Sequence, residues 1–248
     1  MSIEFKSLCK SFDGSRVLED VSLAVEPGEV LFVIGTSGTG KSVLMRHVIG
    51  LHRPDSGEVW VHGQRVDLLS ERELFEIRKR CGFVFQHPAL LDFLSLEENV
   101  AMPLRRRFGL GRKDATERAV SWLSQVGITK DARSLPSEVG PGIRKRASIA
   151  RVVALGPEYI VYDEPTTGLD LVNARRIDNL IRRLATETKV TTVVVSHDLR
   201  SIFGIADRVA FLYLGRLHAL GSPEELRESN DPILSQFLRG RAEGPMVL

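Results

Sequence analysis

Short runs of almost uninterrupted apolar residues recur along the chain, and segments with helical spacing of apolar positions lie between them. The apolar runs are Val30–Ile34, Phe83–Phe85, Tyr159–Tyr162 and Val190–Val195. Such runs are typical of strands that are covered on both faces, as in a parallel sheet. Amphipathic segments such as Ser42–Leu51 and Asn173–Thr188 predict helices between these strands. The alternation predicts a doubly wound α/β core.

Two further patterns do not fit this core. Glu58–His62 followed by Gly63-Gln64, and the turn at Leu214-Gly215-Arg216, each predict an antiparallel hairpin. Between residues 91 and 154 the strand pattern fades and helical periodicity replaces it, which indicates an inserted helical subdomain. The clearest helices predicted there are Arg118–Val126 and Ile143–Leu155.

The pattern changes again after Gly221, where a polar tail begins. Ser222-Pro223 and Asp231-Pro232 each match the start of a short helix, because proline suits the first helical turn. We expect the second of these helices to end in Gly244-Pro245.

Composition excludes several classes of protein. With 43% hydrophobic and 27% charged residues, the 248-residue chain is typical of a soluble globular protein. Its 34 basic and 32 acidic side chains leave a formal net charge of +2, so nothing indicates nucleic acid as a partner. Two cysteines, Cys9 and Cys81, are too few for a disulfide framework or a zinc site and indicate a reducing compartment. No signal segment and no apolar run of the roughly 18 residues needed to span a bilayer is found, so we expect a cytosolic chain.

A phosphate-binding loop is the strongest local signal. Gly35-Thr36-Ser37-Gly38-Thr39-Gly40-Lys41-Ser42 fits G-x-x-x-x-G-K-[ST] and lies between a predicted strand and a predicted helix. The glycines let main-chain N–H groups surround phosphate oxygens, and the helix start adds its partial positive charge. Lys41 is expected to reach the β and γ phosphates of a nucleoside triphosphate, and Ser42 to bind Mg²⁺. The alternative is a glycine turn without a ligand.

Two acids follow the buried strand at Tyr159–Tyr162. Asp163 and Glu164 are therefore expected at the carboxyl edge of the sheet, where open α/β sheets bind ligands. Asp163 is placed to hold the Mg²⁺ shell, and Glu164 to accept a proton from the attacking water. An Asp-Glu pair at a strand end can also be a simple helix cap.

Three other side chains are candidates for the same site. His197 follows the strand that ends at Val195, where its imidazole can contact the γ-phosphate, and Gln86 follows Phe85, where its amide can contact metal and water. Phe12 lies 23 residues before the loop and can stack on a base. The alternatives are a structural histidine and a core-facing strand residue.

With these residues in place, the chain resembles the ABC ATPase family over roughly residues 2 to 240. The matching segments are adenine-stacking Phe12, Walker A Gly35–Ser42, Q-loop Gln86, Walker B Tyr159–Glu164, D-loop Thr167-Gly168-Leu169-Asp170 and H-loop His197. The resemblance implies a P-loop NTPase fold with a RecA-like core, an antiparallel β subdomain and an inserted α-helical subdomain. It also implies that Val43 joins the ATP site, and that two subunits pair head to tail around two ATP molecules.

The resemblance divides the chain into three parts. Residues 1–88 and 156–220 are expected to form the nucleotide-binding α/β core with its antiparallel β subdomain. Residues 89–155 are expected to form the helical signature subdomain, and residues 221–248 the C-terminal tail.

One family motif is altered. Where the family has L-S-G-G-Q, this chain reads Val139-Gly140-Pro141-Gly142-Ile143. Gly140 replaces a serine that donates to the opposing γ-phosphate, and Pro141 has no main-chain N–H. Two phosphate donors are therefore missing. A homodimer is expected to hydrolyse ATP slowly, whereas a heterodimer with a related subunit keeps one complete site.

The segment Asp92–Leu104 looks like the importer-type segment that receives a helix from a membrane permease. The tail at residues 231–245 is similar to the end of Mla-type, Mce-associated ATPases that move phospholipid between bacterial membranes. This similarity implies an MlaE-like permease, an Mce protein, a STAS-domain regulator and a location on the inner face of the cytoplasmic membrane. Another cargo, such as lipoprotein or amino acids, and a catalytically weak ABC switch remain as alternatives.

Three clusters of basic residues stand apart from these motifs. They are Arg78-Lys79-Arg80, Arg105-Arg106-Arg107 and Arg144-Lys145-Arg146. We expect solvated faces, with anionic headgroups or permease loops as the alternative contacts.

Overall fold

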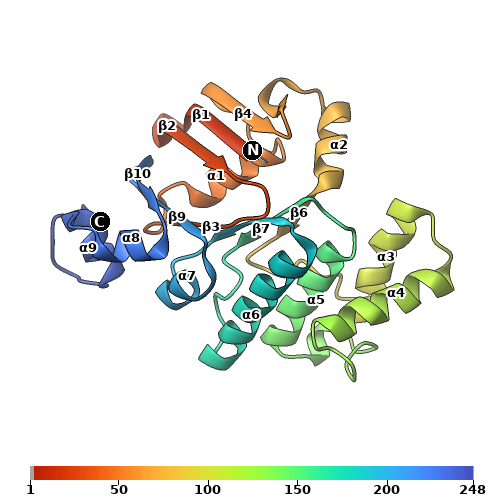
Figure 1. Ribbon diagram of the computed structural model, residues 1–248. Coiled ribbons are helices and arrows are strands. Elements are labelled where there is room, and N and C mark those ends of the chain that lie inside the picture. The colour runs from red at the N-terminus through yellow and green to blue at the C-terminus, as the bar shows by residue number, and fades with distance from the viewer. Residues whose placement is uncertain (1–2, 248) are drawn as a thin grey trace.

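A computed structural model describes residues 3–247; Met1, Ser2 and Leu248, at the ends of the expected parts 1–88 and 221–248, lie outside the described residues. Two sheets and the helices around them make up the molecule (Figure 1). The antiparallel sheet has the order β2-β1-β4-β5, and the second sheet has the order β10-β9-β3-β8-β7-β6. The strands are β1 (Ile3–Phe12), β2 (Ser15–Val25), β3 (Val30–Ile34), β4 (Ser56–Val61), β5 (Gln64–Arg65), β6 (Cys81–Val84), β7 (Tyr159–Asp163), β8 (Thr191–Val195), β9 (Arg208–Tyr213) and β10 (Arg216–Gly221).

The apolar runs of the sequence form the parallel part of the second sheet. Strands β9, β3, β8, β7 and β6 pair in parallel, and β10 returns antiparallel beside β9. Every residue of β3, β7 and β8 is buried, because alternate side chains enter two different cores. Phe32 belongs to the core on the helical side, and Leu31 to the core shared with the antiparallel sheet. This two-sided burial explains why the runs lack an apolar-polar alternation.

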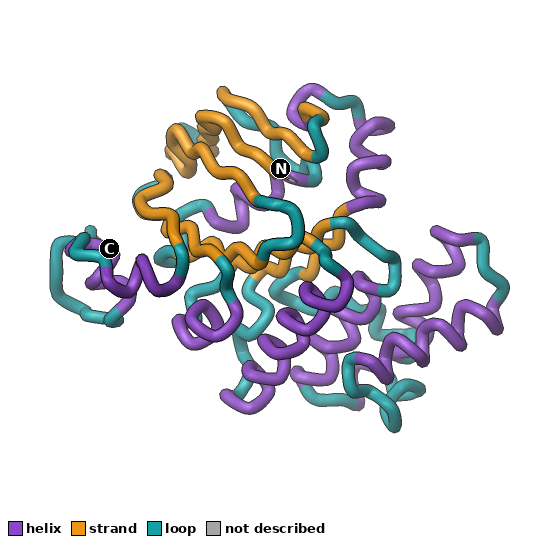
Figure 2. Tube along the Cα trace, in the orientation of Figure 1, coloured by secondary structure: helices purple, strands orange, loops and turns teal. Residues whose placement is uncertain are grey.

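Helices cover the sheet and extend away from it. Figure 2 shows strands gathered in the upper and central part of the molecule, with most helices below and beside them. The helices are α1 (Lys41–Val48), α2 (Glu71–Arg80), α3 (Leu96–Phe108), α4 (Arg112–Gln125), α5 (Pro141–Val153), α6 (Leu171–Thr188), α7 (Leu199–Ile205), α8 (Pro223–Glu228) and α9 (Pro232–Leu238). Short 3₁₀ turns occupy Val66–Leu68 and Pro136–Glu138. None of the helices within residues 3–247 combines the length and apolar character that a membrane span requires.

The structure corrects several predicted boundaries. Helix α4 begins at Arg112 rather than Arg118, because its polar first turns bury little more than Ala115. Helix α9 ends at Leu238 and does not reach Gly244-Pro245, because Gly240 takes the left-handed conformation (φ 58°) that terminates a helix. Strand β6 ends at Val84, so Phe85 lies beyond it.

Helices α2 and α3 were not predicted from the sequence, although each begins with a recognisable capping motif. Ser70 with Glu73 begins α2, and Ser95 with Glu98 begins α3, each as a reciprocal capping box. Pro103 inside α3 interrupts the pattern that identifies a continuous helix. The S-x-x-E spacing was the available signal for both helices.

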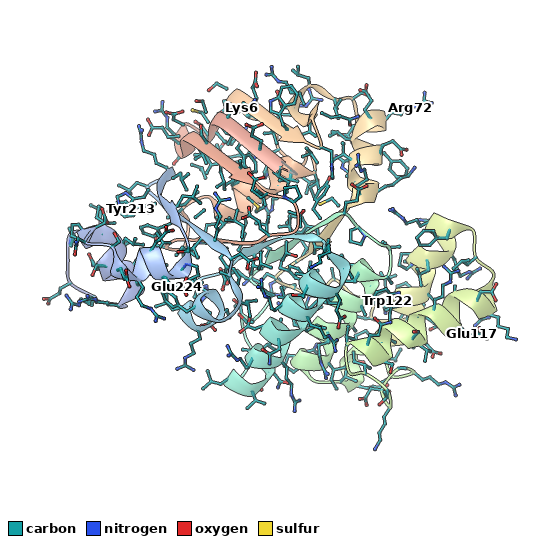
Figure 3. All side chains as sticks on the ribbon, viewed as in Figure 1. Lys6, Arg72, Glu117, Trp122, Tyr213 and Glu224 are labelled. Carbon is teal, nitrogen blue, oxygen red and sulfur yellow. The ribbon has the colours of Figure 1, made fainter. Side chains whose placement is uncertain are left out.

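The C-terminal segment folds back onto the molecule. The Met246 side chain is buried and its N–H donates to the Gln236 Oε1 at 2.7 Å, while the Val247 N–H donates to the Tyr213 hydroxyl at 2.7 Å. Figure 3 places Tyr213 beside this segment, near the helix α8 that carries Glu224. Val247 also lines an open cavity with Thr36, Ser37 and neighbouring loop residues.

Candidate functional site

The loop between β3 and α1 is shaped by its glycines. Gly38 and Gly40 have φ of 81° and 87°, a region that favours glycine. A side chain at Gly40 would also meet Leu18 Cδ2 at 2.7 Å, and one at Gly35 would meet the Leu212 carbonyl oxygen at 2.3 Å. The loop is therefore held close to neighbouring backbone, as a main-chain phosphate cradle requires.

The predicted polar residues meet at the carboxyl ends of the parallel strands. The loop follows β3, Gln86 follows β6, Asp163 and Glu164 end or follow β7, and His197 follows β8. An open cavity of about 500 Å³ lies between them. Its lining residues are Val17, Ser37, Gly38, Gly40, Lys41, Ser42, Val43, Gln86, Glu164 and His197. Thr36 and Thr39 line the adjoining cavity, and the Thr39 hydroxyl donates to the Thr36 carbonyl at 2.8 Å.

Ser42 and Asp163 form the candidate magnesium site. The Ser42 hydroxyl donates to Asp163 Oδ1 at 2.7 Å, and the Asp163 side chain is buried. A hydroxyl beside a carboxylate offers the hard oxygen ligands that Mg²⁺ prefers. No group of three or more His, Cys, Asp or Glu within residues 3–247 forms a metal cage. The residues fit a magnesium ion that is shared with phosphate oxygens and water.

Glu164 is the acid closest to the reaction space. His197 Nδ1 lies 3.0 Å from Glu164 Oε1 and 2.9 Å from Oε2, and the Thr167 hydroxyl donates to Oε2 at 2.8 Å. The main chain of Glu164 has φ 49°, which is uncommon for a residue with a side chain. The carboxylate is thus fixed by two neighbours and by an unusual backbone conformation.

Lys41 is buried, and its ammonium donates to the carbonyls of Gly35 at 2.9 Å and Thr36 at 2.7 Å. Burial lowers the pKa of Lys41, while the nearby charges of Glu164 and Asp163 oppose this change. A buried cation above a loop of N–H groups is suited to a phosphate.

Replacing Lys41 by methionine is expected to weaken binding of Mg·ATP by at least about tenfold, because a charge-assisted hydrogen bond contributes roughly 1.5–3 kcal/mol. Titration of a fluorescent ATP analogue measures this change. The matched control is Lys130→Met, which removes an exposed ammonium on the loop after α4. Equal affinity in the two variants contradicts the proposed role of Lys41.

The comparisons with known proteins agree with this geometry. The family model described as ABC transporter matches residues 18–167, which is more than half of the chain. The chain belongs to the ABC transporter family. It is accordingly an ATP-binding and ATP-hydrolysing subunit.

Relatives and solved structures in this ABC family cover most of the chain. The intermembrane phospholipid transport system ATP-binding protein MlaF of Haemophilus influenzae is 36% identical over 98% of this chain and 92% of its own length. The probable ribonucleotide transport ATP-binding protein mkl of Mycobacterium tuberculosis is 37% identical over 99% of this chain and 68% of its own length. The dimeric structure of the ATP-binding cassette MJ0796 bound to ADP and Pi superimposes with a TM-score of 0.82 at 29% identity, covering 89% of this chain and 98% of that one.

Phe12 is the ABC site residue that the structure leaves apart from the phosphate cavity. Its ring packs edge-on against His52, with centroids 5.2 Å apart, and the Lys10 ammonium lies 5.3 Å from its centroid. At 37% exposure it does not face the core. Val17 lines the cavity instead, and no motif in the sequence marked it.

The altered ABC signature forms a regular helix start. Gly140 is the exposed N-cap of α5 and Pro141 occupies the first helical position, where a missing N–H costs the helix nothing. A side chain at Gly142 would meet Asn173 Oδ1 at 2.8 Å, so any larger residue there requires the Asn173 side chain on α6 to shift. The departure at positions 140 and 141 therefore leaves the fold intact.

The expectation of solvated basic clusters is confirmed for Arg105, Arg106 and Arg107, which are exposed, but it is wrong for Lys145, which is buried. Arg80 makes two 2.6 Å hydrogen bonds to Glu158, and Arg107 donates to the Lys79 carbonyl. Lys145 is buried, and Arg146 donates to the carbonyls of Val126 and Gly127. The sequence alone does not distinguish the inward-facing Lys145 from the exposed cations at 105–107.

Proposed function

We propose that this ABC ATPase powers phospholipid transport between bacterial membranes as part of an Mla-type, Mce-associated system. The observation that carries the proposal is the similarity to MlaF proteins, which extends over 98% of this chain and 92% of the Haemophilus influenzae protein. The similarity to a methionine import protein of Mesorhizobium japonicum, in contrast, covers 87% of this chain and 59% of that protein. In this arrangement an MlaE-like permease binds the chain on the inner face of the cytoplasmic membrane, with an Mce protein and a STAS-domain regulator as further partners.

The chemistry of the motor follows from the strand-end cavity. We propose that the P-loop and Lys41 hold the triphosphate, with Ser42, Asp163 and Gln86 around Mg²⁺. Glu164 accepts a proton from the water that attacks the γ-phosphorus, and His197 orients Glu164 and the phosphate. The ADP–phosphate bond then breaks, and inorganic phosphate leaves.

We propose a head-to-tail dimer in which each ATP also contacts the partner's signature segment. Gly140 and Pro141 offer that ATP neither a hydroxyl nor, at 141, an N–H. A self-pair is therefore slow, and a pair with a related subunit that keeps its serine retains one complete site. The exposed start of α5 supports a contact of this kind.

Purification from membranes in mild detergent tests the cargo. We expect a permease of the MlaE kind and bound phospholipid to co-purify with the tagged chain, and we expect lipid-loaded complexes to show a higher ATPase rate than delipidated ones. An amino-acid permease or a lipoprotein-releasing permease in their place contradicts the phospholipid assignment. A Lys41→Met chain purified in parallel shows whether assembly depends on ATP.

A further inference from the structure

Lys145 lies at the point where three parts of the molecule meet. It is carried by α5, yet its side chain is buried and its ammonium donates to the Gln86 carbonyl and, at 3.2 Å, to the Glu164 carbonyl. One ammonium thus links the signature helix, the loop after β6 and the residue after β7. Both acceptors are main-chain oxygens, and within residues 3–247 no carboxylate forms a salt bridge with Lys145.

This placement is costly for a purely structural residue. Taking an ammonium out of water is unfavourable unless its hydrogen bonds are satisfied. Burial lowers the pKa of Lys145, and the charges of Glu164 and Asp163 oppose this change. Arg146, the next residue on α5, instead donates to the carbonyls of Val126 and Gly127, directly after α4.

The main-chain conformation of Glu164 indicates a role for the Lys145 ammonium. Glu164 has φ 49°, a left-handed conformation that is unfavourable for a residue with a side chain. Its N–H donates to the Val195 carbonyl at 2.9 Å, and its C=O accepts from Lys145. Without the bond from Lys145, the Glu164 carbonyl keeps only the longer bond from the Thr167 N–H, at 3.4 Å.

We propose that Lys145 is a positioning residue for ATP hydrolysis, which holds Glu164 in its left-handed conformation and ties it to the main chain of Gln86. This inference rests on the proposed role of Glu164 as the base. Arg151, two turns further along α5, donates to the carbonyls of Ala89 at 2.7 Å and Pro88 at 3.2 Å. Helix α5 therefore makes hydrogen bonds to the segment that starts at Gln86 from two positions. Of these two cations, Lys145 is the one that also bonds Glu164. A shift of this segment by a membrane partner is transmitted to Glu164 through one ammonium.

Steady-state kinetics of the full chain tests the proposal. Lys145→Met keeps the length of the side chain and removes both hydrogen bonds, so kcat is expected to fall by about tenfold to a hundredfold. KM for ATP is expected to stay within about twofold, because Lys145 does not contact the phosphate loop. Lys145→Arg, which keeps a cation with several donors, is expected to restore most of the rate. Arg146→Met is the matched control on the same helix and is expected to keep the wild-type kcat.

The outcomes separate this inference from the proposed function. A kcat for Lys145→Met equal to that of Arg146→Met, in chains with equal thermal unfolding temperatures, overturns the positioning role. A rise in the KM for ATP that accompanies the fall in kcat also overturns the positioning role, since it indicates that the fold or the ATP site has been lost. If Lys145→Met does not fold, Lys145→Gln replaces it, because its amide can bond one carbonyl but cannot hold both. Glu164→Gln, measured alongside, tests the role of Glu164 as the base. Full activity of Glu164→Gln overturns both proposals. If Glu164→Gln loses activity but Lys145→Met does not, only the inference about Lys145 is overturned.

Discussion

Restoring the signature by the double substitution Gly140→Ser and Pro141→Gly is expected to raise the ATPase rate of the isolated chain by at least about tenfold. One donor aimed at a transition-state charge contributes roughly 2.7–4 kcal/mol, and the double change supplies two. The main chain is compatible with serine at position 140 and glycine at position 141. Gly140 has φ −69° and ψ 163° with open space where a side chain would begin, and serine is favoured at a helix N-cap.

Phosphate release under saturating Mg·ATP measures the effect. The two single variants show how the gain divides between the hydroxyl and the N–H. Adding Glu164→Gln to the double variant is expected to abolish the gain, which shows that the activity belongs to this chain. An unchanged rate in the double variant removes the idea that the altered signature limits hydrolysis.

Glu164→Gln is the second change with a large expected effect, a fall in kcat of about 10²- to 10⁴-fold with Mg·ATP affinity almost unchanged. The amide cannot accept the proton of the attacking water, although it preserves the shape that Thr167 and His197 contact. Because ATP is bound but not cleaved, the variant is also expected to accumulate as an ATP-bound dimer.

Rapid-quench hydrolysis and size-exclusion chromatography with ATP test the two parts of this expectation. Glu158→Gln is a matched control, since Glu158 immediately precedes β7 at the end of the strand opposite to Glu164 and pairs with Arg80. We expect it to keep the wild-type rate. Comparable losses in the two variants contradict a specific role for Glu164.

The sequence predicted the core of the fold because burial on both faces leaves a simple signal. The runs that became β3, β7 and β8 were found almost to the residue, and the turn at Gly215 was found through its glycine. Helices α2 and α3 were missed because their surfaces are mainly polar and Pro103 interrupts α3. The end of α9 was misplaced because Gly240, and not the later Gly244-Pro245, stops the helix.

The candidate site was predictable where its residues follow parallel strands, since topology alone brings Gln86, Asp163 and His197 to one edge. Side-chain contacts were not predictable in this way. The bond from Lys145 to Glu164 joins residues 19 apart through the packing of α5, and no periodicity reveals it. Phe12 matched a motif position, but the structure places it at the end of β1 with its ring against His52 and not among the residues that line the phosphate cavity.

The folded-back C-terminus has a practical consequence for work on this protein. Val247 lies in a cavity with Thr36, Ser37, Gly38 and Thr39 of the phosphate loop. An affinity tag fused after residue 248 is attached next to Val247, which lines the same cavity as the phosphate loop, and we expect it to disturb the contacts of Met246 and Val247. We expect kinetic constants measured with such a fusion to differ from those of the untagged chain, so the tag is best cleaved off or moved to the other terminus before any rate is compared.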